Sequence, residues 1–231
     1  MSQGPAAHFV RQLQPISGHG QQDITAELRR AILSGRVRPG SLVAIHAVAE
    51  FFGVSPIPVR EALKTLVGEG LVEHRGRAGY HVTRFGFSEL EELYIACQAL
   101  ELAAIPRALA LAGPDDDLRL RSAFRRSQSA IRADEAIELQ AATKDFHFAL
   151  VAPARMTMVD ELLERVWNLT EPGQPMQHND RERRTMLQKE HADQLDAFLT
   201  RDAELLHRLT IEHYDTLFET IAGLPMFDKP E

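Results

Sequence analysis

The feature that most restricts the fold of this chain is a short stretch in which Pro56 and Pro58 stand directly before a run of strong helix formers. Proline has no backbone N–H, so it breaks a helix interior but fits the first turn, where that group has no acceptor in the helix. Ser55 precedes the pair and is a typical N-cap residue, whose hydroxyl can accept a backbone N–H. The stretch therefore predicts a helix that begins at Pro56 and ends near Glu69.

Three further elements surround this helix. Apolar residues recur at helical spacing over 23–35, and a second short helix is expected over 44–52. In 71–82, apolar pairs flank a tip rich in glycine and arginine, which is typical of a β-hairpin. The order of helix, short helix, tight turn, helix and hairpin predicts a winged helix-turn-helix.

Arg60 lies about one turn into the predicted recognition helix. The first residues of such a helix reach base edges in the major groove, and a guanidinium can bond both O6 and N7 of guanine. Arg75 and Arg77 lie on the hairpin tip, where they can reach a groove or the phosphate backbone. The alternative is a three-helix bundle in which Arg60 is a solvated surface residue.

The face of the predicted recognition helix that is expected to pack against the other helices comprises Ala62, Leu63, Leu66 and Val67.

Charge divides the chain in the same way. Residues 1–84 carry 10 Lys+Arg and 6 Asp+Glu, a net of +4, whereas the remainder carries 16 and 27, a net of −11. The two parts sum to the overall net charge of −7. A basic front on an acidic body favours contact of the front with a polyanion, with a chance fluctuation as the alternative.

The rest of the chain predicts helices almost throughout. Residues 1–20 are rich in Gly, Pro, Gln and Ser, and we expect a flexible arm there. The DNA-binding domain is expected over 21–85 and a second domain over 88–224, to which the resemblance described below assigns effector binding and dimerisation. Breaks near residues 112–117, 133–134, 152–155, 171–175 and 200–202 predict about six helices. The expected fold class is mainly α, a winged helix-turn-helix followed by an antiparallel helical bundle.

Three histidines stand out in the second domain: His147, His191 and His213. The last two lie on apolar stripes about ten and twelve residues from the break near Arg201, so they are nearly level on neighbouring antiparallel helices. Level, inward histidines can share a metal ion. The alternative is that they are buried histidines with ordinary hydrogen bonds.

The strings LRRAILSGRVRPGSLV and VAEFFGVSPIPVREALKTLVGEGLVEHRGRAGYHV resemble the N-terminal domain of the GntR family of bacterial transcription regulators. The resemblance implies DNA contacts by Ser55, Ile57, Pro58 and Arg60 on the recognition helix, by His46, and by wing residues such as Arg75 and Arg77. Pro56 departs from the family, which often has arginine there, so the operator sequence is expected to differ from the commonest family pattern.

The helical remainder resembles the FCD effector domain of the FadR subfamily, in which an aspartate and three histidines often bind a divalent metal. His147, His191 and His213 match the histidine positions, but Thr143 stands where the family has aspartate. Asp145 is two residues from His147 and lies on another side of the helix. A three-histidine site completed by water or an effector carboxylate suits Zn, Ni or Mn.

The expected effector pocket also includes Cys97 and Glu101. Cys97 stands where the family commonly has an arginine that faces a carboxylate ligand, so the usual binding of a small hydroxy acid or dicarboxylate is not expected. We expect Cys97 to be a small pocket or core residue rather than a thiol sensor, because a reactive thiol needs surroundings that lower its pKa.

The leading interpretation is a homodimeric, cytoplasmic transcription regulator, a repressor, that binds a palindromic operator in double-stranded DNA and responds to an anionic small molecule. One alternative is a DNA-binding regulator with a degenerate, metal-free effector site. A remote one is a metal-dependent hydrolase, but the sequence offers no positioned general base, phosphate loop or nucleophile elbow, so an enzyme is not expected. Neither a signal peptide nor an apolar run of about 18 residues is present, which predicts no membrane span. The single cysteine fits a reducing compartment.

Overall fold

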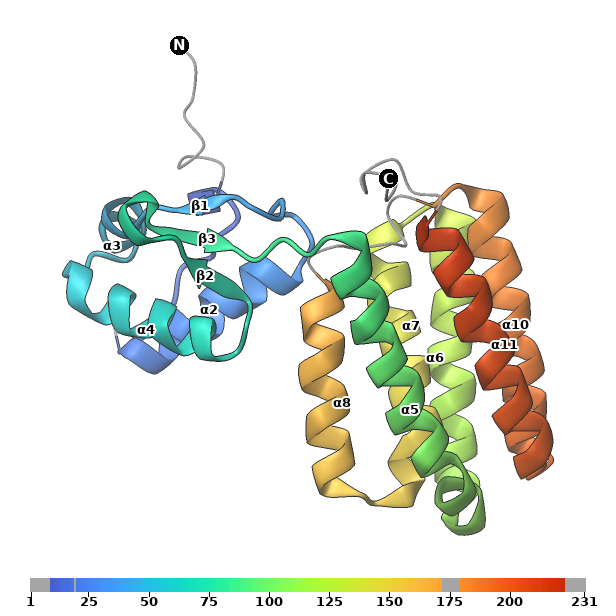
Figure 1. Cartoon of the computed structure of the whole chain (residues 1–231). Coiled ribbons are helices and arrows are strands. Elements are labelled where there is room, and N and C mark those ends of the chain that lie inside the picture. Colours follow the sequence, from blue (N-terminus) through green and yellow to red (C-terminus); the bar gives the residue numbers. More distant parts are fainter. Residues whose placement is uncertain (1–8, 19, 172–178, 223–231) are drawn as a thin grey trace. The chain divides into compact units, whose positions relative to one another are not determined.

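The computed structural model describes residues 9–18, 20–171 and 179–222, which divide into two compact units (Figure 1). The first comprises residues 1–85 with the segment 168–173, and the second comprises the remainder. The predicted fold class is confirmed: the first unit has helices and a small three-stranded sheet, and the second is built from helices throughout its described part.

Three helices of the first unit are α2 (Gln21–Leu33), α3 (Ile45–Phe52) and α4 (Pro56–Gly68). Gly53 ends α3 with a φ of 66°, a left-handed conformation that glycine adopts without strain, and this turns the chain into α4. Ser55 occupies the N-cap position of α4, but its side chain accepts no hydrogen bond from the helix, contrary to the prediction. Ser55 is an exposed residue.

The buried face of α4 differs from the expected one in a single residue: Val59 is buried in place of Val67. Val59, Ala62, Leu63 and Leu66 are fully buried, whereas Val67 is 37% exposed. The buried set follows the i, i+3, i+4, i+7 spacing of one helix face, and Val67 lies beyond its edge.

The sheet contains β1 (Leu42–Val43), β2 (Val72–His74) and β3 (Tyr80–Val82), in the order β1-β3-β2. The predicted hairpin is β2 and β3, which pair antiparallel with Val72 opposite Val82. Strand β1 was not predicted, because two residues are too few to show an alternating pattern. The hairpin tip contains a 3-10 turn, η1 (Gly76–Ala78).

Part of the predicted N-terminal arm packs on this core. Phe9 is 0% exposed and Leu13 is 7% exposed, and both belong to the apolar cluster of the first unit. The expectation of a flexible arm up to residue 20 was therefore wrong for residues 9–18, because burial of these apolar side chains outweighs the Gly- and Gln-rich composition around them. Residues 1–8 and 19 lie outside the described residues.

The second unit has six described helices, the number that the sequence predicted. They are α5 (Phe87–Leu111), α6 (Pro114–Ala133), α7 (Ala136–Val151), α8 (Thr157–Thr170), α10 (Arg181–Leu199) and α11 (Ala203–Ala222), with a 3-10 turn, η2 (Ala152–Ala154), between α7 and α8. The helices lie alongside one another around one apolar core. The break expected at 171–175 falls almost wholly outside the described residues.

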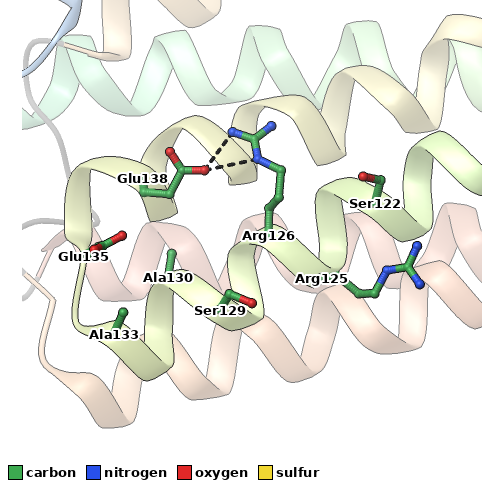
Figure 2. Close-up of a pocket in the computed structure, with 8 residues that line it drawn as sticks. All are labelled: Ser122, Arg125, Arg126, Ser129, Ala130, Ala133, Glu135 and Glu138. Carbon is green, nitrogen blue, oxygen red and sulfur yellow. Dashed lines mark hydrogen bonds and ion pairs between the residues drawn. The ribbon is translucent and has the colours of Figure 1, made fainter.

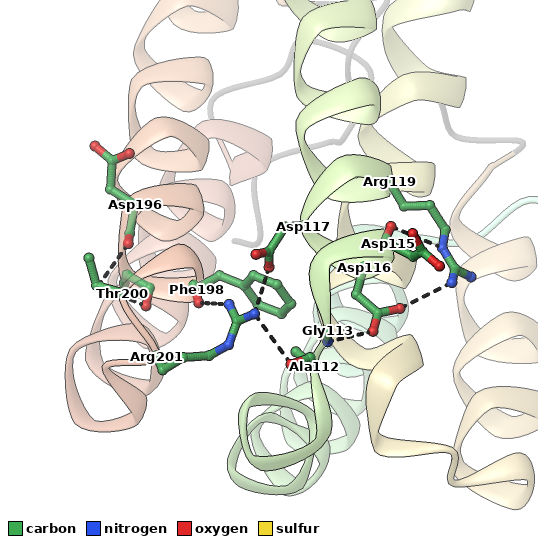
Figure 3. A network of polar contacts seen from close by, with 11 residues as sticks. Ala112, Gly113, Asp115, Asp116, Asp117, Arg119, Asp196, Phe198, Thr200 and Arg201 are labelled. Carbon is green, nitrogen blue, oxygen red and sulfur yellow. Dashed lines mark hydrogen bonds and ion pairs between the residues drawn. The ribbon is translucent and has the colours of Figure 1, made fainter.

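The turn between α10 and α11 is fixed by Arg201, which has a φ of 59° (Figure 3). Its guanidinium donates to the carbonyl oxygen of Phe198 at 2.7 Å and to Asp117 Oδ1 at 2.8 Å. It also donates to the carbonyl oxygen of Ala112 at 3.3 Å. One side chain thus ties this turn to the junction of α5 and α6 and holds the helix pair that carries His191 and His213.

Helix α5 is, among the described helices, the one long and apolar enough by composition to cross a membrane. Length and composition are weak indications, because the core helix of a bundle has both. Leu90, Tyr94 and Ile105 of α5 are buried in the core of the second unit. We therefore interpret α5 as a bundle helix.

Candidate DNA interface and buried histidine centre

The start of α4 presents exposed side chains of mixed chemistry. Ser55, Ile57 and Arg60 are exposed, and Ile57 reaches 68% exposure, the highest of the large apolar side chains in the described residues. Pro56 and Pro58 are partly buried in the first turn. A hydroxyl, an apolar side chain and a guanidinium at a helix N-terminus are suited, respectively, to a phosphate, a thymine methyl and a guanine edge.

Arg60 has no carboxylate partner among the described residues, although the next cation along the helix, Lys64, pairs with Glu61 at 2.8 Å. An unpaired guanidinium can bind a base without first breaking an ion pair. Arg60 is thus an exposed guanidinium without a described ion-pair partner, and its contact with DNA stays a prediction.

The two wing arginines differ from each other. Both are exposed, but Arg75 donates to Glu73 at 2.5 Å, whereas no described carboxylate pairs with Arg77. An exposed ion pair of this kind is weak and exchanges readily with other partners. His46 is exposed on α3. Each of the predicted DNA-contacting side chains is thus at the surface or, for Pro58, partly so.

In the second unit, the structure brings together the three predicted histidines. His147 on α7, His191 on α10 and His213 on α11 each offer one ring nitrogen, and these nitrogens lie within 4.8 Å of one another. His147 Nε2 and His191 Nε2 are 3.3 Å apart. All three side chains are buried, at 2–3% exposure. The near-level placement that helix length predicted for His191 and His213 is thus present, and His147 joins them from a third helix.

Two carboxylates orient two of the rings. Glu101, fully buried on α5, lies 3.2 Å from His147 Nδ1 and accepts a hydrogen bond from the Tyr214 hydroxyl at 2.8 Å. Glu190 on α10 lies 2.8 Å from His213 Nδ1. A neutral imidazole that donates its Nδ1–H to a carboxylate keeps the Nε2 lone pair free. In that tautomer, His147 and His213 would each present Nε2 to a metal ion.

The partner of His213 was missed at the level of sequence. Glu190 directly precedes His191, and neighbouring residues on a helix face different directions, so no local pattern pairs Glu190 with the histidines. The side chain of Glu190 points toward α11, where its carboxylate contacts His213. Tyr214 was missed because the buried hydroxyl contacts Glu101, which is 113 residues away along the chain.

Burial lowers the pKa of His191 well below its ordinary value, and the nearby His213 and His147 lower it further. The pKa of His213 is also lowered, chiefly by burial, against the opposing hydrogen bond to Glu190. Both rings are therefore neutral at neutral pH. This is the state in which imidazole binds a metal, because ligand nitrogens must be unprotonated.

A small cavity of about 20 Å³ adjoins the three rings. A cavity volume of about 10–15 Å³ accommodates one water molecule. The cavity is closed by aromatic and apolar side chains together with two polar residues of α7. Its lining comprises the three histidines with Tyr94, Gln140, Thr143, Trp167, Leu187, Tyr214 and Leu217.

The residues predicted to form the effector pocket do not all line this cavity. Thr143 lines the cavity, four residues before His147 on the same helix face. Cys97 is fully buried in the core and does not line the cavity, and burial with the nearby Glu101 raises the pKa of its thiol far above the ordinary value. Asp145 faces away from the histidines and pairs with Arg126, so it supplies no ligand here.

A second hollow, of about 340 Å³, lies on the surface between α6 and α7 (Figure 2). It is lined by small and charged side chains that include Arg125, Arg126 and Glu138. Arg126 is neutralised by Glu138 at 2.8 Å and by Asp145. The hollow shares no lining residue with the histidine cavity.

Comparison with known proteins agrees with both regions. Residues 21–82 match the family model described as bacterial regulatory proteins, gntR family, and residues 92–216 match the FCD domain. The chain is 27% identical over 202 residues to the uncharacterized HTH-type transcriptional regulator BphR of Paraburkholderia xenovorans, covering 84% of this chain and 82% of that protein. It is 25% identical to the HTH-type transcriptional repressor RspR of Escherichia coli, covering 91% and 92%.

Among solved structures, Escherichia coli McbR/YncC superposes with a TM-score of 0.76 at 20% identity, covering 87% of this chain and 96% of that one. A regulator from Rhodococcus superposes with the same TM-score at 24% identity, covering 88% and 97%. These likenesses show the fold. The relatives are transcription regulators and not enzymes. The fold of the solved structures matches the helix-turn-helix and the helical bundle seen here. The chain therefore belongs to the GntR family of bacterial regulatory proteins and carries an FCD domain after its DNA-binding domain.

Proposed function

We propose that this regulator is a repressor whose operator binding is modulated through the histidine centre of its FCD domain. The observation that carries the proposal is the convergence of three buried histidines, two of them in contact with carboxylates, inside a domain joined to a DNA-binding head. In this proposal the head spans 21–85 and the helical domain 88–224, of which residues 223 and 224 lie outside the described part.

In the DNA-bound state, α4 would lie in the major groove with Ser55, Ile57, Pro58 and Arg60 toward the bases. His46, Arg75 and Arg77 would contact the flanking groove or backbone. The exposure of these side chains and the lack of a described ion-pair partner for Arg60 support this assignment. Such a head covers one half-site, so two copies on a palindromic operator are expected.

We propose that the second domain supplies the dimer contact. Exposed large apolar side chains occur on several of its described helices, among them Ile95 on α5 at 51% exposure and Met158 and Leu162 on α8 at 66% and 49%. Large apolar groups that remain exposed on a monomer are suited to burial against a second copy. Sedimentation analysis should show a dimer that Leu162→Glu dissociates, whereas a monomeric wild type would contradict this assignment.

The residues present fit a divalent metal such as Zn, Ni or Mn. His147, His191 and His213 would hold the ion, with Glu101 and Glu190 fixing two of the rings. A bound metal would supply a positive centre to which an anionic effector could coordinate. Of the three predicted pocket residues, Thr143 would lie beside that effector, whereas Cys97 and Glu101 do not line the cavity.

The experiment is elemental analysis of the purified, untagged protein before and after chelator treatment and after reloading with zinc or nickel. About one transition metal per chain, lost with chelator and regained on loading, is the expected result. No metal after loading would instead favour a second candidate, a regulator whose histidines only form hydrogen bonds. The contact between His147 and Glu101 and that between His213 and Glu190 are the observations that favour it.

A further inference from the structure

Gln140 on α7 is a polar side chain of the histidine cavity whose acceptor is unused. It is 6% exposed, lines the cavity, and its Oε1 has no hydrogen-bond partner among the described residues. A buried polar group without a partner costs about 1–3 kcal/mol. The unpaired oxygen of Gln140 lies in the wall of the cavity that the three histidines share, so a ligand held there could supply its partner.

The position of Gln140 on the helix defines how far it can reach. Gln140, Thr143 and His147 follow the i, i+3, i+7 spacing and share one face of α7. A residue four before a histidine can bind the same metal ion directly, and that position holds Thr143. Gln140 begins about 10 Å along the axis from His147, so it would act on the ion through an intervening ligand rather than by direct coordination.

The cavity limits that intervening ligand in size. Its volume of about 20 Å³ suits one water molecule or a ligand atom of similar size, at about 10–15 Å³ per water. Bulky side chains, Trp167 and Leu187 among them, close the remaining space. An organic acid therefore cannot enter this conformation beside the histidines unless side chains move.

We propose that Gln140 is a positioning residue for the metal ion. It holds the oxygen ligand that completes the coordination of that ion, because Thr143 stands where an acidic ligand would otherwise be. The proposal rests on the metal site proposed above. The oxygen ligand is a water in the absence of effector, and it donates a hydrogen bond to Gln140 Oε1. The anionic effector enters by displacing it. Three imidazoles then face the ion directly, and one carboxamide faces it through the water.

The chain offers a matched control. Gln194 on α10 is also fully buried with an unpaired Oε1, but it does not line the cavity, and its Nε2 donates to the Thr210 hydroxyl at 3.3 Å. Gln194→Leu therefore makes the same chemical change in the same bundle, away from the proposed ligand.

The test uses the full chain with Zn²⁺ or Co²⁺ alone as the probe. Zinc affinity is measured by competition with a chromophoric chelator, and the visible spectrum of the Co²⁺-loaded protein reports the coordination of the ion. Gln140→Leu should weaken zinc binding roughly 10–100-fold, the usual effect of removing an outer-shell partner, and should change the cobalt spectrum. Gln194→Leu should change neither. Gln140→Asn, which keeps the carboxamide, should retain more of the affinity than Gln140→Leu.

The outcomes separate the two proposals. If the wild type binds zinc but Gln140→Leu binds it equally well with an unchanged cobalt spectrum, the role of Gln140 is refuted and the metal site stands. If the wild type binds neither ion, the metal site is refuted and the role of Gln140 with it. If Gln140→Leu and Gln194→Leu weaken binding equally, the effect is a general loss of packing, which also refutes the specific role.

Discussion

At the start of α4, Ser55, Ile57 and Arg60 are exposed, and no described carboxylate pairs with Arg60. In the helical bundle, His147, His191 and His213 are 2–3% exposed and two of them contact carboxylates. The exposed side chains of the first region are solvated, and a large polyanion could replace that water. The second is closed around a cavity of about 20 Å³, which suits one water molecule or a ligand atom of similar size. Under the proposed function, DNA would be bound without rearrangement of these side chains, whereas an organic effector would require the bundle to move.

The comparison also predicts different responses to mutation. An exposed contact residue can be removed with little effect on folding, so its loss should appear in DNA binding alone. A buried residue that touches its neighbours should affect ligand binding and stability together. Four variants or conditions test this difference, taken from the largest expected effect to the smallest.

Replacing His191 by Ala removes one of the three converging imidazoles. We expect zinc affinity to fall by more than about 100-fold, beyond the roughly 10–100-fold typical of outer-shell changes, because a direct ligand is lost. Chelator competition measures the change. His207, an exposed histidine on α11, provides the control His207→Ala, which should bind zinc like the wild type. Equal affinities of all three proteins would show that His191 is not a ligand.

Replacing Arg60 by Ala should weaken specific DNA binding without changing metal content. A bidentate contact between arginine and guanine is worth about 1–3 kcal/mol, which corresponds to about 5–160-fold per half-site. The probe is a duplex selected from a random pool by the wild type, with binding followed by fluorescence anisotropy. Arg208→Ala, an exposed arginine of α11, is the control. Binding by Arg60→Ala as tight as that by Arg208→Ala would remove Arg60 from the interface.

Replacing Glu190 by Gln tests whether a carboxylate orients His213. The amide can accept the same hydrogen bond but lacks the charge, so we expect about a 10-fold loss of zinc affinity with unchanged DNA binding by the chelator-treated protein. Glu204→Gln, an exposed change on α11, is a suitable comparison. A zinc affinity that does not change would mean that the 2.8 Å contact between Glu190 and His213 has no role in ligand binding.

The pH dependence of stability tests the buried, neutral state of the rings. The pKa values of His191 and His213 are lowered in the folded protein, so below pH about 6.5 the unfolded chain binds more protons than the folded one. The free energy of unfolding of chelator-treated protein should therefore fall as the pH falls below about 6.5, by at most about 1.4 kcal/mol per pH unit for each ring.

Urea unfolding at pH values between about 5 and 7 measures this slope. The double variant His191→Gln/His213→Gln lacks both titrating groups, so its stability should depend less steeply on pH than that of the wild type. Equal slopes would mean that the two rings become protonated in the folded protein as readily as in the unfolded chain.

The two regions also differ in how far they could be predicted from sequence. Pro56, Gly53 and the apolar spacing around α4 are local signals, and the helix begins at Pro56 as expected. The convergence of His191 and His213 followed from helix lengths alone. The contacts of Tyr214 with Glu101, of Glu190 with His213, and the unused oxygen of Gln140 depend on how separate helices face one another, which no local pattern specifies. Burial of Phe9 and Leu13 was missed for the same reason.

The central claim is that ligand binding at the histidines changes DNA binding by the head. The most direct measurement is the affinity of full-length wild type and His191→Ala for the selected duplex, each chelator-treated and then loaded with zinc. The account predicts that zinc changes the affinity of the wild type by about 5–150-fold, the usual range of coupling between two sites, and leaves that of His191→Ala unchanged. Equal DNA affinity of the wild type with and without bound zinc would contradict it.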